Sequence, residues 1–128
     1  MNASERDTIE AVATEIVQAA YAVSNELGAG FLEKVYENAM AVELRFREIQ
    51  FSQQPPLIIR YRGVVVGDFK PDLLVEHHVI VELKCVENFS REHVAQCLNY
   101  LRATGLHLAL LVNFQKPKVD IKRIVLDL

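Results

Sequence analysis

Apolar and polar residues alternate at helical spacing through the first part of the chain. Apolar side chains recur every three or four positions over residues 4–27, and again over residues 31–48. This spacing places apolar side chains along one face of a helix. Ser4 is the expected cap of the first helix, and Gly28 is expected to end it, because glycine readily adopts a left-handed backbone conformation. The apolar side of the second helix is predicted to comprise Phe31, Val35, Ala39, Val42 and Phe46.

The pattern changes to that of β-strands after the consecutive prolines Pro55 and Pro56. Residues 57–61 and 64–75 are predicted strands, and residues 79–84 are nearly all apolar, as in a strand covered on both faces. Further on, a helix capped by Ser90 or Asn88 and two strands, residues 107–114 and 119–126, are expected. The sequence therefore predicts an α/β fold: a mixed five-stranded sheet with an N-terminal helical hairpin and a crossover helix.

The polar residues 76–78 are the only break between two apolar runs, so a tight antiparallel turn is predicted there. If the loop has three residues, Val75 faces Val79, and counting back along the strands places Asp72 opposite Glu82. A two-residue loop would shift the register by one position and turn the side chains of one strand to the other face.

In the three-residue register, Lys84 shares a face with Asp72 and Glu82. Carboxylate oxygens suit Mg²⁺ or Mn²⁺, which leave room for water and a substrate phosphate. A neighbouring ammonium group can orient the attacking water or offset charge on the phosphoryl oxygens. Asp68 is a further candidate ligand. The alternative interpretation is an ordinary surface ion pair between Glu82 and Lys84.

Composition narrows the classes of function. The 128 residues, 51% of them hydrophobic, fit a single domain spanning residues 1–128. The formal net charge of −3 argues against tight, permanent DNA binding but does not exclude a nuclease, because a bound metal restores positive charge locally. Arg60, Arg62 and Lys70 are candidates for phosphate contacts. Cys85 and Cys97 are expected to be free thiols. With no signal peptide or apolar span, a cytoplasmic protein without membrane contact is expected.

Two short motifs resemble those of a known family. Pro71 and Asp72, followed after nine residues by Glu82, Leu83 and Lys84, resemble the PD-(D/E)XK nuclease signature. Upstream, the spacing of Gly30, Glu33 and Tyr36 resembles the motif of the GxxExxY proteins, a bacterial branch of that superfamily. The resemblance extends over nearly the whole chain and implies a nuclease-like α/β core.

The resemblance also implies a set of functional residues. The active-site set would be Asp72, Glu82 and Lys84, with Glu33 as an additional acidic group preferred over Glu37. Gln96 and Tyr100, four positions apart on the predicted third helix, resemble a motif that positions substrate in exonuclease-like members; a partly buried helix face would show the same spacing.

Tyr36 is a further positioning candidate, although a packed tyrosine whose hydroxyl is hydrogen-bonded fits its surroundings as well. The leading hypothesis is hydrolysis of a nucleic-acid phosphodiester that depends on Mg²⁺ or Mn²⁺. The competing hypothesis is a non-catalytic assembly or interaction module on a nuclease-like fold. A homo-oligomer is expected. The choice between DNA and RNA, and between endo- and exonuclease action, stays open.

Overall fold

The computed structural model describes all residues from Met1 to Leu128. It contains three helices and seven strands, which are, in chain order, α1 (Ala3–Leu27), α2 (Glu33–Phe46), β1 (Phe51–Gln53), β2 (Leu57–Tyr61), β3 (Val64–Phe69), β4 (Leu73–Val75), β5 (Val79–Lys84), α3 (Arg91–Thr104), β6 (Leu108–Asn113) and β7 (Asp120–Val125).

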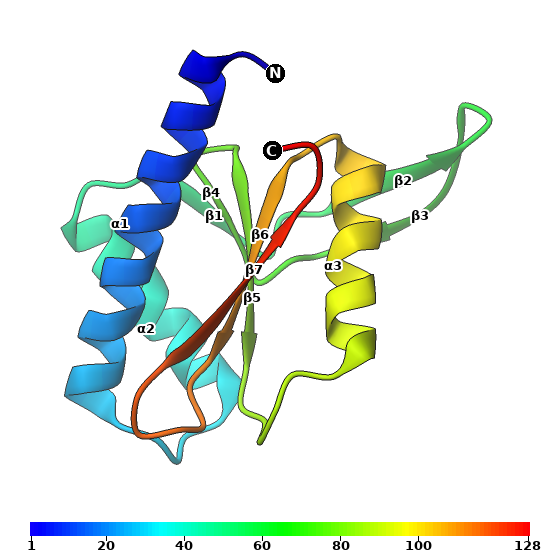
Figure 1. The fold of residues 1–128 in the computed structure, drawn as a ribbon. Coiled ribbons are helices and arrows are strands. Elements are labelled where there is room, and N and C mark those ends of the chain that lie inside the picture. The colour runs from blue at the N-terminus through cyan, green and yellow to red at the C-terminus, as the bar shows by residue number, and fades with distance from the viewer.

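A mixed five-stranded sheet, in the order β1-β4-β5-β6-β7, forms the centre of the molecule. Strands β5 and β6 are parallel, connected through α3, and all other neighbours are antiparallel. Helices α1 and α2 pack on one face of the sheet and α3 on the other (Figure 1). The predicted mixed sheet, helical hairpin and crossover helix are confirmed. No helix combines the length and the apolar character needed to cross a bilayer.

The predicted first helix is present, but a different residue caps it. The Asn2 side chain accepts a hydrogen bond of 2.8 Å from the backbone N–H of Glu5. The Ser4 cap is therefore wrong, because Ser4 already lies inside the first turn. The predicted Ser90 cap of α3 is confirmed: its hydroxyl accepts from the N–H of His93, whose ring contacts the N–H of Ser90 in return.

Helix α2 buries a different face from the one predicted. The buried apolar side chains are Tyr36, Met40, Ala41 and Leu44. The predicted apolar side is largely open to solvent, with Phe31 49%, Val35 40%, Val42 64% and Phe46 83% exposed. Both sets recur every three or four residues, so the period of the pattern could not identify the face that meets α1 and the sheet.

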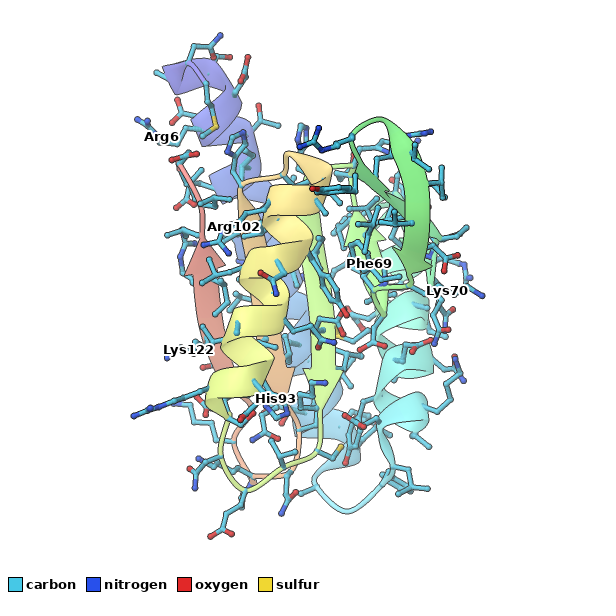
Figure 2. All side chains as sticks on the ribbon, turned by 90° about the vertical axis from the view of Figure 1, so that its right-hand side faces the viewer. Arg6, Phe69, Lys70, His93, Arg102 and Lys122 are labelled. Atoms are coloured by element: carbon cyan, nitrogen blue, oxygen red, sulfur yellow. The ribbon has the colours of Figure 1, made fainter.

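The predicted strand of residues 64–75 is two strands in different sheets. Strand β3 pairs only with β2 and forms a separate ribbon, whereas β4 joins the main sheet, where β1 occupies the edge. The chain breaks at Lys70 and Pro71, because proline has no N–H to donate to a strand ladder. The ribbon projects beside α3, with Phe69 between the two (Figures 1 and 2).

Tyr36 anchors the turn between α1 and α2. Its buried ring stacks on Phe114 at a centroid distance of 4.5 Å. Its hydroxyl donates to the Gly28 carbonyl at 2.6 Å and accepts from the Phe31 N–H at 3.3 Å. These contacts match the alternative given above, a packed tyrosine whose hydroxyl is hydrogen-bonded. The role of Tyr36 in positioning substrate stays a prediction.

We predict that Tyr36→Phe lowers the free energy of unfolding by about 1–3 kcal/mol, because it leaves a backbone carbonyl and an N–H without their partner. Urea denaturation would measure the loss. Tyr61→Phe is the matched control: Tyr61 is 63% exposed, so its hydroxyl should contribute less than about 0.5 kcal/mol. Equal effects of the two substitutions would contradict the anchoring role.

Candidate active site

The site lies where β4 begins and β5 ends. The turn between these strands has three residues: Val75 pairs with Val79 and Leu73 with Val81, so the predicted register is confirmed. Asp72, directly before β4, therefore lies across from Glu82. One carboxylate oxygen of Asp72 accepts a hydrogen bond of 2.7 Å from the backbone N–H of Leu83.

Burial makes the two carboxyl groups difficult to ionise together. It raises the pKa of Glu82 to about 8, and the negative charge of Asp72 adds to the increase. Burial likewise raises the pKa of Asp72, while the Leu83 N–H and the Lys84 ammonium act in the opposite direction. Lys84 lowers the pKa of both carboxyl groups but forms no salt bridge with either. The Lys84 ammonium is therefore near both acids without being held in an ion pair.

Glu37 of α2 joins this acidic pair. It is 3% exposed, and its carboxylate accepts hydrogen bonds from Lys34 at 2.9 Å, from Gln54 at 3.0 Å and from Gln53. Burial acts to raise the pKa of Glu37, but these donors outweigh it and hold the pKa below its ordinary value. The charge of Glu37 in turn raises the pKa of Asp72, so the two groups are neighbours.

Glu33, expected to be the acidic group from this helix, lies on the exposed first turn of α2. Its charge acts on the Cys85 thiol, whose pKa is raised first by burial and then by Glu33. Of Glu33 and Glu37, Glu37 is the one whose charge acts on Asp72. A role for Glu33 stays a prediction. Glu37 falls on the same helical face as Met40 and Leu44, and recognising that face in the sequence would have indicated it.

The structure brings the predicted pair on α3 to the same site. Tyr100 stacks on Phe69 at 3.8 Å, with 7° between the ring planes. Burial raises the pKa of the Tyr100 hydroxyl, the charge of Glu82 adds to this, and a side-chain contact with Gln96 opposes it. The Tyr100 side chain therefore lies near Glu82, on the side of α3 that faces the ribbon, with Gln96 next to it.

The thiols and the end of β5 have structural roles. Cys85 and Cys97 are free, as predicted, and burial raises the pKa of Cys97 to about 12. Asn113, fully buried and paired with Lys84 in the parallel register, contacts Val86 twice: its amide nitrogen donates to the Val86 carbonyl at 2.7 Å, and its oxygen accepts from the Val86 N–H at 3.2 Å. These bonds fix the backbone just beyond Lys84.

The donor chemistry of the site fits a hard divalent cation. No three His, Cys, Asp or Glu side chains in the structure are arranged as a complete metal cage. Mg²⁺, however, commonly takes only one or two protein carboxylates, and Asp72 and Glu82 supply that number. A cation would also offset the burial and the neighbouring negative charges that raise the pKa values of Asp72 and Glu82. Asp68 pairs with Ile58 on the exposed ribbon and is separate from this site.

A mixed sheet flanked by helices, with two facing acids and a lysine two positions beyond the second acid, is the core layout of a nuclease-like α/β protein. The family comparison agrees, since residues 10–124 match the model of the PD-(D/E)XK nuclease superfamily. The chain belongs to this superfamily, whose nucleases generally use divalent metals. The comparison with curated proteins returned no match.

Two solved structures share the fold. One is an alkaline exonuclease (LHK-Exo) from Laribacter hongkongensis, with a TM-score of 0.54 and 17% sequence identity, covering 73% of this chain and 56% of that one. The other is SSO0001, with a TM-score of 0.58 and 15% identity, covering 74% of this chain and 50% of that one. The chain thus spans only about half the length of these structural relatives.

We predict a pH-dependent stability that originates in the acidic pair. In a chelating buffer, the folded protein holds a proton on Glu82 between its ordinary pKa of 4.5 and its raised pKa of about 8, where the unfolded chain has released it. The free energy of unfolding should therefore fall as the pH rises through this interval, and the raised pKa of Asp72 adds to the fall.

Glu82→Gln should remove much of this slope, because the amide does not ionise. Urea denaturation at several pH values would compare the two proteins. If the free energies of unfolding of the wild type and of Glu82→Gln differ by the same amount at every pH, the fold does not favour the neutral form of Glu82.

Proposed function

We propose that the protein hydrolyses nucleic-acid phosphodiester bonds with the help of Mg²⁺ or Mn²⁺. The observation that carries this proposal is the burial of Asp72 and Glu82 against each other beside the uncommitted ammonium of Lys84. Paired acids of this kind are costly for a fold and are found where a metal or a reaction needs them. Membership of the nuclease superfamily supports the same chemistry.

Each residue of the site has a proposed role. Asp72 and Glu82 would bind the cation, which when bound would polarise the phosphoryl group and lower the pKa of water. Lys84 would position the attacking water and offset negative charge as it develops on the phosphoryl oxygens. Glu37, ionised and held by three donors, would orient a water or the bound cation in the place that the resemblance assigns to Glu33. Tyr100 and Gln96 would position the substrate.

The family branch, the extent of the domain and the metal ion are part of the same proposal. The Gly30, Glu33 and Tyr36 spacing supports placement in the GxxExxY branch. We treat residues 1–128 as one nuclease-like domain, since the central sheet draws strands from residues 51 to 125. Mg²⁺ is the preferred ion because the proposed protein ligands are carboxylate oxygens alone.

Nucleic acid would approach along the ribbon of β2 and β3. Arg60, Arg62 and Lys70 are exposed and form no salt bridge, whereas Arg47 and Arg123 are both paired with carboxylates. The Arg62 guanidinium lies over the Tyr61 ring at 5.7 Å. Only Lys70 and Pro71 separate the end of the ribbon from Asp72, so a nucleic-acid strand bound on the ribbon would lead into the site.

The catalytic assignment predicts the behaviour of Lys84→Ala. This variant should lose cleavage of DNA or RNA by roughly 100-fold or more, because it lacks the ammonium group that positions the attacking water and offsets the charge developing on the phosphoryl oxygens. It should keep its fold and its affinity for Mn²⁺ measured by calorimetry. Lys122→Ala, which removes an exposed lysine on β7, is the control and should cleave like the wild type. Wild-type protein that neither binds divalent ions nor cleaves a broad substrate panel would refute the function.

The ribbon assignment predicts a salt-dependent defect in binding. In the Lys84→Ala background, Arg60→Gln with Arg62→Gln should weaken binding to a nucleic-acid duplex and reduce the slope of log affinity against log salt by about 1 per lost phosphate contact. The control pair, Arg6→Gln with Lys122→Gln, removes the same amount of charge from the side of α3 opposite the ribbon (Figure 2). Equal slopes for the two double variants would exclude the ribbon as the contact surface.

A further inference from the structure

Gln54, the residue that follows β1, is hydrogen-bonded to two acids of the site at once. Its backbone N–H donates to the Asp72 carbonyl at 3.0 Å, and its side-chain amide donates to the Glu37 carboxylate at 3.0 Å. The remaining donors, such as Leu83 at Asp72 and Lys34 at Glu37, each bond one acid of the site only. Gln54 therefore links the acid that lies on the sheet to the acid that lies on α2.

The backbone conformation of Gln54 makes this link possible. The N–H of Gln54 continues the β1–β4 ladder one position beyond the pair of Gln53 and Leu73. Successive side chains of a strand point to opposite faces of the sheet, so a regular strand would direct only one of the two glutamines toward α2. Gln54 instead has a φ of 51°, in the left-handed region. Both glutamine side chains consequently reach the Glu37 carboxylate.

This conformation is unfavourable for a glutamine. The Cβ atom crowds the backbone in the left-handed region, and glycine adopts that region at lower cost. Pro55 follows directly, and a proline further restricts the backbone of the residue before it. Glycine at position 54, however, would have no amide to donate to Glu37. Backbone strain of this kind is found at functional sites, and here it accompanies the contact with an acid of the site.

The contact of Gln54 with Glu37 is not what holds α2 on the sheet. Gln54 is exposed, whereas α2 is attached through its buried apolar side chains. Without the Gln54 amide, Glu37 would keep Lys34 and Gln53 as donors. The charge of Glu37 acts on Asp72, so the direction of the Glu37 carboxylate matters at the acidic pair. Loss of the amide should therefore disturb that direction and leave the fold intact.

We propose that Gln54 is a positioning residue of the active site, whose side-chain amide fixes the Glu37 carboxylate relative to Asp72. In this position Glu37 is directed toward the attacking water or the bound cation. The inference rests on the proposed function and adds to it a residue that lies outside both sequence motifs. Because Gln54 acts through Glu37, its loss should slow the reaction more than it weakens substrate binding.

Gln54→Met tests this role, because methionine has nearly the same length and no N–H to donate. It should lower kcat by about 10-fold, a usual cost of losing a residue that orients the groups of a metal site. KM should change by less than about twofold. The matched control is Gln50→Met, directly before β1, since Gln50 is exposed and its side chain forms no hydrogen bond. This control should cleave like the wild type, and circular dichroism should show both variants folded.

A double-mutant cycle shows whether Gln54 acts through Glu37. Glu37→Gln combined with Gln54→Met should lower kcat no further than Glu37→Gln alone, because the amide then has no carboxylate to position.

NMR of the metal-free protein gives a readout that does not depend on cleavage. Glu37→Gln should shift the side-chain amide signals of Gln54, which donates to Glu37, and leave those of Gln50 in place.

Four results would overturn the inference alone in a wild-type protein that cleaves. These are a Gln54→Met variant that cleaves equally well, losses that add independently in the cycle, a larger change in KM than in kcat, and Gln54 amide signals that do not respond to Glu37→Gln. A wild-type protein that neither binds Mn²⁺ nor cleaves any substrate would instead overturn the proposed function, and the role of Gln54 with it.

Discussion

The burial of two carboxyl groups at one point of the sheet is the constraint on which the rest of the molecule depends. Asp72 and Glu82 face each other across β4 and β5, and the raised pKa of both groups shows that the fold alone does not satisfy their charges. The Leu83 N–H and the nearby Lys84 lower the free-energy cost of burying these two charges but do not remove it. A bound cation would balance the charges of the two buried carboxylates, which is a physical reason for a fold to keep them together.

The elements around the acidic pair hold it from both faces of the sheet. On one face, α2 supplies Glu37, which is fixed by donors from its own helix and from β1 and the residue that follows it. On the other face, Tyr100 of α3 stacks on Phe69, and the charge of Glu82 acts on its hydroxyl. Asn113 ties down the chain after Lys84. The site is therefore assembled from side chains that lie far apart in the sequence, and its geometry depends on the whole sheet.

Helix α2 combines three functions on three sides. Tyr36 anchors its start, Glu37 enters the site, and the opposite stripe from Leu32 to Phe46 is open to solvent. Although α2 has many apolar residues, only one of its sides is buried in the core. The side of α2 that meets the acids therefore differs from the side that is open to solvent.

The sequence by itself determined the arrangement around the turn at residues 76–78. Long apolar runs on both sides and three polar residues between them predicted the register that pairs Asp72 with Glu82 for a three-residue loop, and the structure chose this register over that of a two-residue loop. The sequence also indicated the mixed sheet, the crossover helix, and Tyr100 with Gln96 as neighbours of the site.

The tertiary structure alone decided which face of α2 is buried, and therefore that Glu37 and not Glu33 joins the acids. It also decided that β3 leaves the main sheet and that β1 takes the edge position. The reason is physical. Period and propensity are local properties of the chain, whereas the choice between two equally periodic faces is made by the surfaces that they meet.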